Sequence, residues 1–419
     1  MNRGVDRTLL LIVFLLTAFG LLILYSTGQT DLVGRIRGSW LQQPQWLWVK
    51  QSIYIVVGIG LAAGMYRMSF RLLEWATPWL YGFSLAILAL TLLIGHGAGA
   101  AKSEKSWIGF GGVNVQPVEF AKLATILMLA RWFAARREPP LTLRGLIQPI
   151  MIALVPALLV LKQPDLGSAI VFAGILFGVM FWAAVPVSLL VFLASPVLSL
   201  VLSFSTTAWS VWMVILFLLL LYWRPFFLEG IAVYLANSAM GVLALVVWAK
   251  MQQHVRDRII SFLNPSAYSQ AGGFQAVESR VAIGSGGWFG TGLTLGPQKR
   301  SGYIPERATD FIFAVVGEEL GLLGVLVALG LFLALLFALV RIARQASDPY
   351  ASLIVFGVAS LVFTHVFENV GMTISIMPIT GIPLPFFSAG GSFLMALAIG
   401  LGMSFRAAEE GRAASYVES

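Results

Sequence analysis

Apolar runs of roughly 17–25 residues recur along the whole chain, and polar segments separate them. A helix needs about 20 mostly apolar residues to cross a hydrocarbon core of ~30 Å. The runs are rich in Leu, contain Gly and Pro, and lack the alternation of barrel strands, so they indicate helices. The sequence therefore predicts an all-α polytopic membrane protein with about twelve spans, at 8–27, 50–66, 77–95, 117–134, 146–161, 167–184, 186–203, 208–222, 230–250, 311–340, 351–376 and 388–406.

Two of these spans have alternatives. Only a short Ser205-Thr206-Thr207 turn separates 186–203 from 208–222, so a single re-entrant hairpin is the alternative to two full spans. The first apolar run resembles a signal-peptide core, but no convincing small-residue cleavage site follows it, and we interpret it as a retained helix.

Composition agrees with a membrane protein. Hydrophobic residues make up 58% of the 419 residues and charged residues 11%, whereas a soluble protein carries roughly 25% charge. There is no cysteine, which excludes disulfides and Cys-based metal sites. The net charge of +8 indicates contact with anionic membrane lipids, and we expect no nucleic-acid partner.

The distribution of Lys and Arg predicts the orientation. Arginines before the first span and in alternate short loops fall on one side, which the positive-inside rule assigns to the cytoplasm. Both termini are then cytoplasmic, and the polar segments at 28–49, 96–116, 251–310 and 377–387 face outward. We treat 1–419 as one membrane domain with a large extracytoplasmic loop at 251–310 and a short, loose cytoplasmic tail at 407–419.

The segment from Tyr303 to Gly321 closes the longest polar stretch and opens an apolar helix, with Asp310 at the junction. Carboxylates at the edge of a membrane are costly unless they serve a function. Asp310 is therefore the first candidate for chemistry, whereas Glu318 and Glu319, further along the helix, are expected to support the structure.

Other candidates lie near the expected outer ends of spans. Trp107 is a functional residue or an interfacial aromatic. Glu119 and Lys122 are spaced i, i+3 at a helix start, so they can pair and face the bundle or a cavity. Asp165 opens another span, where an N-cap is the simplest role. Glu368 lies inside the eleventh span and could pair with the nearby His365.

Two glycine-containing segments complete the set. Backbone N–H groups of the Gly-rich stretch 282–292 could cradle a phosphate, with cations nearby, although a flexible turn is the default interpretation. Ser388 and Ser392 lie where Pro and Gly break the last span, so they line a cavity or only mark a kinked helix start. The nearby cations are Arg280, Lys299 and Arg300.

In this order, the motifs resemble those of the SEDS family (shape, elongation, division and sporulation), and the resemblance covers most of the chain. Its specific parts are Gln116-Pro117-Val118-Glu119-Phe120-Ala121-Lys122, Gln163-Pro164-Asp165-Leu166-Gly167-Ser168, Ile304-Pro305-Glu306-Arg307-Ala308-Thr309-Asp310-Phe311-Ile312-Phe313, Gly317-Glu318-Glu319-Leu320-Gly321 and Pro383-Leu384-Pro385-Phe386-Phe387-Ser388-Ala389-Gly390-Gly391-Ser392.

The resemblance implies a peptidoglycan glycosyltransferase that polymerises lipid II on the outer face of the bacterial cytoplasmic membrane. It also implies a class B penicillin-binding protein, a transpeptidase, as partner. Asp310 matches the essential outer-loop aspartate of the family, and Trp107 matches its functional tryptophan. The elongation branch (RodA-like) is favoured over the division branch (FtsW-like).

The chain departs from the family in three places. We expect twelve spans where the family usually has ten, with the extra pair near 186–222. Ala308 and Ala389 replace a common His and a common Tyr, so those positions carry no shared side-chain role. Because two added spans return the chain to the same side of the membrane, they do not change the side on which Asp310 lies.

Chemistry and alternatives follow from these residues. A carboxylate at Asp310 can act as general base, and Arg280, Lys299, Arg300 and the Gly-rich stretch are candidates to bind the leaving pyrophosphate. Trp107, Glu119, Lys122, Asp165, Ser388 and Ser392 are the further candidate substrate contacts. No cofactor or metal cluster is evident in the sequence. A divalent cation that bridges the pyrophosphate is a further alternative. The alternatives are a lipid II flippase and an inactive scaffold.

Overall fold

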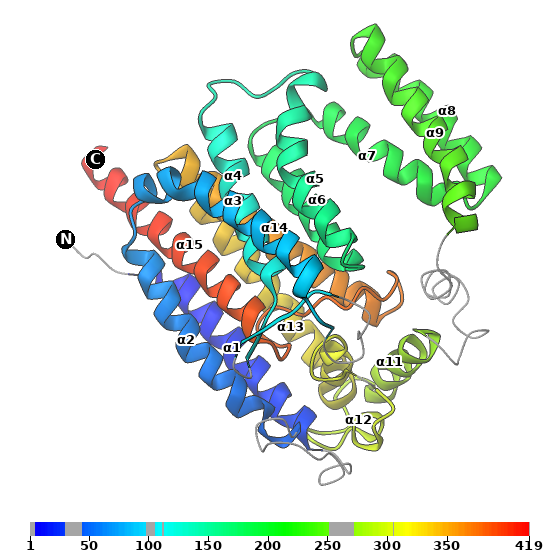
Figure 1. The fold of residues 1–419 in the computed structure, drawn as a ribbon. Helices are drawn as coiled ribbons and strands as arrows, with labels where there is room; N and C mark the ends of the chain where they lie inside the picture. The colour runs from blue at the N-terminus through cyan, green and yellow to red at the C-terminus, as the bar shows by residue number, and fades with distance from the viewer. Residues whose placement is uncertain are drawn as a thin grey trace.

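The structure is a computed structural model that describes residues 5–29, 44–97, 105–110, 113–250, 272–304 and 306–418. Each of the twelve predicted spans coincides with one helix. The helices pack into one bundle, with α8 and α9 standing to one side of it (Figure 1). These twelve helices are α1 (Arg7–Gly28), α2 (Leu47–Arg67), α3 (Phe70–Ile94), α4 (Pro117–Ala134), α5 (Ile147–Leu161), α6 (Leu166–Trp182), α7 (Val187–Leu202), α8 (Thr206–Trp223), α9 (Phe227–Lys250), α13 (Ile312–Gln345), α14 (Pro349–Thr373) and α15 (Gly391–Glu418).

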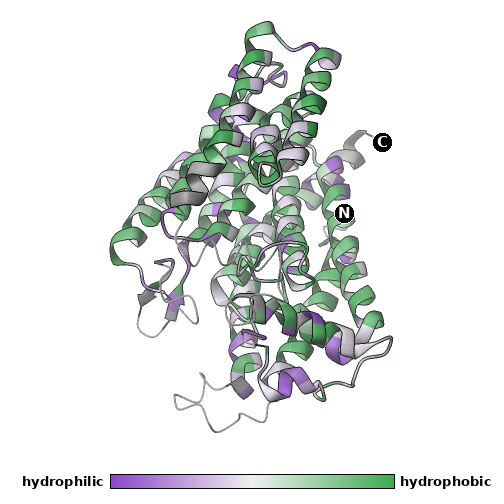
Figure 2. Cartoon of the chain, turned by 90° about the vertical axis from the view of Figure 1, so that its right-hand side faces the viewer, coloured by the Kyte–Doolittle hydropathy of each residue, from purple (hydrophilic) through white to green (hydrophobic). Residues whose placement is uncertain are grey.

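The remaining elements are short and lie between the spans. In the described part of the chain, nine helices are long and apolar enough to cross a membrane, and α6 and α7 are apolar but shorter. Most of the helix surface is hydrophobic, and hydrophilic residues gather toward the helix ends (Figure 2). The short elements are η2 (Pro44–Trp46), β1 (Ile108–Phe110), β2 (Val113–Val115), η3 (Arg144–Leu146), α11 (Gly272–Gly286) and α12 (Pro297–Ser301), with β1 and β2 pairing antiparallel.

Small polar residues start several of the helices. The carboxylate of Asp6 accepts the Leu9 amide at the start of α1, and the hydroxyl of Ser69 accepts the Leu72 amide at the start of α3. Such caps satisfy backbone donors that a helix start leaves unpaired. Because Ser69 caps α3, this helix begins seven residues before the predicted 77. The charged Arg71 and Glu74 had lowered the apparent hydropathy of its first turns.

Helices α4 and α14 form the centre of the bundle, and most of their side chains are buried. Helix α6 approaches α14 closely through glycines. A Cβ at Gly174 or Gly178 would collide with Thr364 or Ser360, respectively. Close approach through small residues replaces the hydrophobic driving force that is absent between helices in lipid.

The predicted span 311–340 is bent where the sequence suggested a continuous helix. Gly321 takes φ 63° and ψ −160°, which breaks α13 into two helical pieces. Only glycine reaches such a conformation without strain. The first piece carries Glu318 and Glu319 and begins just after Asp310, while the second runs on to Gln345.

The predicted pair 186–203 and 208–222 forms two separate helices, α7 and α8. With α9 they share a buried polar network, in which Asn237 donates to Ser195 Oγ at 2.8 Å and accepts from Trp212 Nε1 at 3.2 Å. Interhelical hydrogen bonds of this kind hold transmembrane helices together. The three helices therefore form a unit with its own internal contacts.

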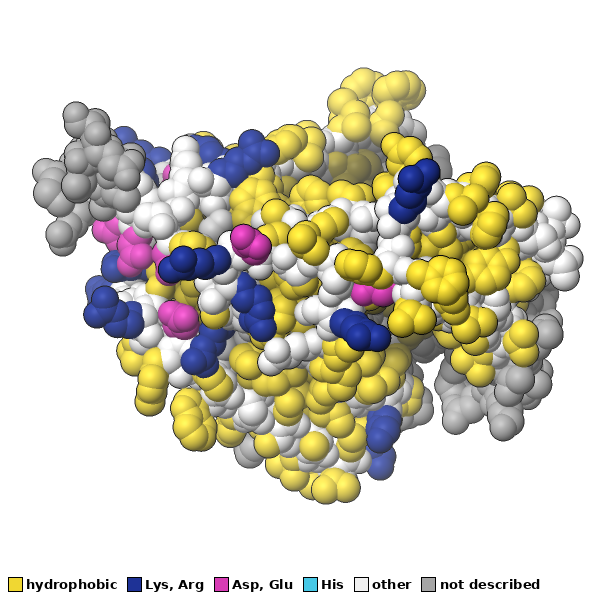
Figure 3. All heavy atoms as spheres, turned by 90° about the horizontal axis from the view of Figure 1, so that it is seen from above, with side chains coloured by type: hydrophobic (Ala, Val, Ile, Leu, Met, Phe, Trp, Pro, Cys, Tyr) yellow, Lys and Arg dark blue, Asp and Glu magenta, His cyan; other side chains and the backbone are white. Residues whose placement is uncertain are grey.

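Lys and Arg side chains are spread over one end of the bundle, which we call the arginine end (Figure 3). There Arg341 donates to the carboxylate of Asp6 at 2.9 and 3.0 Å. The opposite end, which holds Asp310, is the Asp310 end. The segment 407–419 is expected from the sequence to be a loose tail. Instead, α15 continues to Glu418, and Ala407 and Ala408 are buried.

Candidate active site

Asp310 lies at the end of a tight turn that precedes α13. The amides of Thr309 and Phe311 both donate to the carbonyl of Glu306, which takes a left-handed φ of 50°. The side chain of Asp310 is partly exposed and faces Gly381, where an added Cβ would lie 3.4 Å from Asp310 Oδ2. The turn thus presents a carboxylate at the Asp310 end, as the sequence predicts.

Ser388 and Ser392 are both buried, and their hydroxyls bond to the protein. The hydroxyl of Ser388 donates to the Thr309 carbonyl and accepts from the Leu384 amide at 2.8 Å. Ser392 Oγ accepts the Gln116 amide at 2.9 Å. These bonds favour structural roles over the predicted contacts with substrate.

The predicted pairing of Glu119 with Lys122 is confirmed. Lys122 Nζ lies 2.8 Å from Glu119 Oε1, and both side chains are almost fully buried. Lys122 Nζ also lies 3.2 Å from Nε2 of His365, whose Nδ1 lies 3.1 Å from the Pro383 carbonyl. The pair therefore ties α4 to α14 and to the segment before Ser388.

The predicted pairing of His365 with Glu368 is wrong. The ring of His365 turns to Lys122 and stacks on Phe393, with ring centroids 4.2 Å apart. Glu368 is 1% exposed, and neither carboxylate oxygen has a hydrogen-bond partner among the described residues. The hydroxyl of Thr380 donates to Met372 Sδ at 3.8 Å.

Asp165 takes the N-cap position that its place in the sequence favours. Its Oδ1 accepts the Ser168 amide at 2.9 Å at the start of α6. Asp165 thus opens the helix that packs against both α14 and α4.

Lys299 is completely buried in a second polar cluster. Its ammonium donates to Glu319 Oε1 at 2.6 Å, to the Ser26 carbonyl at 2.9 Å and to Ser26 Oγ at 3.1 Å. Burial lowers the pKa of Lys299, and the carboxylate of Glu319 opposes that shift. All three ammonium hydrogens have acceptors, which argues against the expected contact between Lys299 and pyrophosphate. Sequence reasoning missed Ser26, because nothing local connects the end of α1 with residue 299.

Glu318 and Glu319 support the structure, as the sequence indicated. Glu318 accepts the amides of Gln298 at 2.6 Å and Lys299 at 3.2 Å, which caps α12. Glu319 holds the ammonium of Lys299. Together the two carboxylates fasten α12 to the first piece of α13.

The Gly-rich stretch docks on the break in α13. The amides of Thr291 and Gly292 donate to the carbonyls of Glu318 and Glu319, at 3.0 and 3.1 Å. On the other side of the break, the amides of 322 and 323 donate to the carbonyls of 287 and 288. The stretch therefore satisfies backbone groups that the break leaves without helical partners. Since the amides of 291 and 292 already donate to the protein, the expected phosphate cradle is disfavoured.

The remaining candidates lie on the surface or beside the β1–β2 pair. Arg280 is exposed on α11, and Arg300 is partly buried on α12. Arg307, beside Asp310, donates from Nε to the Thr27 carbonyl at 3.4 Å, and burial lowers its pKa while Glu306 opposes the shift. Trp107 is partly buried, and its backbone pairs with that of His96. Within the described ranges, no three His, Asp or Glu side chains are grouped as metal ligands.

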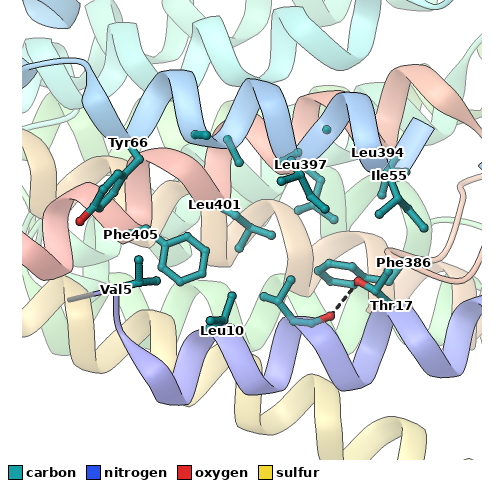
Figure 4. A pocket seen from close by; sticks show the side chains of 16 residues that line it. Val5, Leu10, Thr17, Ile55, Tyr66, Phe386, Leu394, Leu397, Leu401 and Phe405 are labelled. Atoms are coloured by element: carbon teal, nitrogen blue, oxygen red, sulfur yellow. Dashed lines mark hydrogen bonds between the residues drawn. The ribbon is translucent and has the colours of Figure 1, made fainter. Parts of the chain in front are cut away.

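An apolar groove runs between α1 on one side and α2 and α15 on the other (Figure 4). It has a volume of about 300 Å³, and Phe386 closes the end nearer Asp310, while Tyr66 and Phe405 mark the other end. The groove arises because α1 packs along α13 and α2 packs along α15, which leaves α1 and α15 apart.

Comparison with known proteins places the chain in a family. The profile of the FtsW/RodA/SpoVE family, described as cell cycle protein, matches residues 6–224 and 202–413. The two matches overlap in α8, within the pair of helices that the sequence indicated as additional.

Named relatives match over almost the whole chain. Peptidoglycan glycosyltransferase RodA of Treponema pallidum is 34% identical, over 97% of this chain and 99% of that protein. Peptidoglycan glycosyltransferase MrdB of Escherichia coli K12 is 32% identical, over 95% and 92%. Probable peptidoglycan glycosyltransferase FtsW of Geobacter metallireducens is also 32% identical, over 95% and 93%.

Solved structures agree with this relationship. One, from work on the structural coordination of polymerization and crosslinking by a peptidoglycan synthase complex, superposes with a TM-score of 0.70 at 27% identity, over 97% of this chain and 98% of that one. The rod shape determining protein RodA of Thermus thermophilus gives 0.60 at 26%, over 97% of each chain. The chain therefore belongs to the FtsW/RodA/SpoVE family of cell cycle proteins.

Proposed function

We propose that this protein is a peptidoglycan glycosyltransferase that polymerises lipid II into glycan strands, with Asp310 as the general base. The observation that carries the proposal is the partly exposed carboxylate of Asp310, which a tight turn holds at one end of a transmembrane bundle. The near full-length similarity to proteins named peptidoglycan glycosyltransferase supports the reaction class.

The reaction is a glycosyl transfer with inversion. The hydroxyl oxygen of the acceptor sugar attacks the anomeric carbon of the donor, and the new C–O bond forms as its proton passes to the carboxylate of Asp310. The bond between the anomeric carbon and the pyrophosphate oxygen breaks, and the polyprenyl pyrophosphate leaves with that electron pair. A positioned base contributes about 10²–10⁴-fold to such a step.

The leaving pyrophosphate carries negative charge that cations stabilise as it develops. Arg307 lies in the same turn as Asp310, and Arg280 and Arg300 lie on the neighbouring α11 and α12, so these three are the proposed contacts. Lys299 is omitted, because its ammonium is used within the protein. Lys122 is omitted for the same reason, because its ammonium is fully buried between Glu119 and His365.

The apolar groove is proposed to hold the polyprenyl chain. From Leu394 to Phe405 it extends along twelve residues of α15, or about 17 Å at a rise of ~1.5 Å per step. Phe386, at one end, belongs to the segment that bonds to the Asp310 turn. A hydrocarbon chain in the groove would thus end near the reacting headgroup.

We further propose that the Asp310 end faces outward from the bacterial cytoplasmic membrane and that both termini are cytoplasmic. The gathering of arginines at the opposite end supports this orientation through the positive-inside rule. Cysteines introduced at Ala100 and Glu410 test it, because an impermeant thiol reagent added to intact spheroplasts should label the first and not the second.

A class B penicillin-binding protein is the proposed partner, since a similar structure comes from a complex that coordinates polymerization and crosslinking. We propose a role in elongation; a relative named RodA is 34% identical and one named FtsW is 32% identical. Depletion of the protein should therefore produce round cells, whereas filamentation would assign it to division.

Purified protein incubated with labelled lipid II tests the activity. Formation of long glycan strands supports the proposal. Movement of lipid II across liposome membranes without any polymer would favour a flippase. If neither activity occurs and only loss of partner binding impairs growth, the protein is a scaffold.

A further inference from the structure

The backbone leading into Asp310 is held by residues from outside its turn. The carbonyls of 308–310 each accept one hydrogen bond. The amide of Ala389 donates to the first at 2.7 Å, the hydroxyl of Ser388 to the second, and the side-chain amide of Asn369 to the third at 2.8 Å. Three consecutive peptide groups are thus fixed in direction.

Asn369 uses both hydrogens of its amide nitrogen at this point. The second donates to the carbonyl of Ile382 at 2.7 Å, and the side chain is fully buried. Ile382 follows Gly381, against which Asp310 Oδ2 lies. One amide group therefore sets the separation between the two chain segments that meet at the Asp310 carboxylate.

Ser388 is itself held from two sides. The backbone amide of Leu384 donates to its hydroxyl, and the side-chain Nε2 of Gln51 donates to its backbone carbonyl at 3.2 Å. The Asp310 backbone is therefore anchored to α14 through Asn369, and to α2 through Ser388 and Gln51.

We propose that Asn369 and Ser388 are positioning residues for Asp310. They need not touch substrate, and they fix where the carboxylate stands when the acceptor hydroxyl arrives. The inference rests on the proposed role of Asp310 as base. A misplacement of about 1 Å can cost on the order of 100-fold in rate, so loss of either side chain lowers kcat. KM changes little, because substrate binding does not use these groups.

Asn369→Leu removes both donated bonds at similar side-chain volume. We expect kcat per folded molecule to fall by about 10-fold to 100-fold, with KM for lipid II within ~3-fold of wild type. Ser388→Ala is the second variant and should lower kcat in the same direction, which covers the case that Asn369→Leu fails to fold.

The chain offers a matched control for each variant. Asn237 is also fully buried and donates two bonds from its amide nitrogen, to Ser195 Oγ and the Val233 carbonyl. Ser199 is also buried, donates to a carbonyl and accepts from Trp209 Nε1. Both lie in the α7–α9 unit, so Asn237→Leu and Ser199→Ala should lower stability and leave kcat per folded molecule unchanged.

The outcomes separate this inference from the proposed function. Reduced kcat in the Asn369 and Ser388 variants, with normal kcat in the controls, supports positioning. If Asp310→Asn abolishes polymerisation while folded Asn369 and Ser388 variants keep wild-type kcat, the positioning role is wrong and the base assignment stands. An equal loss of kcat in the variants and their controls also overturns positioning, because it reflects general destabilisation.

Discussion

At the scale of single residues, two kinds of buried charged side chain differ in how they are stabilised. The charges of Lys122 and Lys299 are matched by a carboxylate within 2.8 Å. Glu368 is also buried, but neither of its carboxylate oxygens has a hydrogen-bond partner among the described residues. A buried ion pair is costly to break, whereas an unpaired buried carboxyl destabilises the folded state by itself.

Glu368→Met should therefore stabilise the protein. An apolar side chain of similar length replaces the buried carboxyl, and we expect a gain of about 1–3 kcal/mol in the free energy of unfolding. The measurement is thermal or denaturant unfolding in detergent. The contrasting variant Glu319→Gln breaks the pair with Lys299 and should cost about 3–5 kcal/mol. A Glu368 variant that is less stable than wild type would contradict this assignment.

The residue scale also shows what local sequence can predict. Glu119 and Lys122 are three residues apart on one helix, so their pairing follows from helix geometry. His365 and Glu368 have the same spacing but do not pair, because Lys122 from another helix binds the ring. The bonds of Lys299 to Ser26 join residues 273 apart, and no local pattern carries that information.

At the scale of elements, the break in α13 and the Gly-rich stretch form one structure. The break at Gly321 leaves backbone groups on either side without helical partners, and the stretch after α11 supplies them. The sequence located both segments but could not show that they meet. Its apolar runs predicted the helices well, since each span needs enough apolar length to cross the membrane.

Gly290→Ala tests this coupling. Gly290 has φ 80°, and an added Cβ would lie against the Glu319 carbonyl, so the substitution should cost about 2–3 kcal/mol. Gly284→Ala on α11 is the matched control, because open space surrounds that position and alanine favours a helix. The readout is unfolding in detergent. Equal stability of the two variants would show that the docked turn contributes nothing.

At the scale of the whole molecule, the bundle separates a charged arginine end from the end that holds Asp310. An apolar groove between α1 and α15 leads from one toward the other. Neither the position of the groove nor the side-by-side packing of α2 with α15 could be predicted from the sequence, because hydropathy gives the spans and not their neighbours. The family resemblance gave the site and its proposed chemistry.

The groove predicts a dependence on lipid chain length. Ala63→Phe places a ring in the groove and should raise KM for a long-chain polyprenyl substrate several-fold, with little effect on a short-chain analogue. Val56→Phe on the same helix is the control, because Val56 is 69% exposed and lies outside the groove lining. An equal effect of Ala63→Phe on both substrates would mean that the groove does not bind the substrate chain.

The most direct test of the account is polymerisation of lipid II by Asp310→Asn, which keeps the size of the side chain and removes the base. The account predicts a fall in kcat of about 10²–10⁴-fold, with unchanged thermal unfolding and KM within ~3-fold of wild type. A folded Asp310→Asn protein that makes glycan strands at the wild-type rate would contradict it.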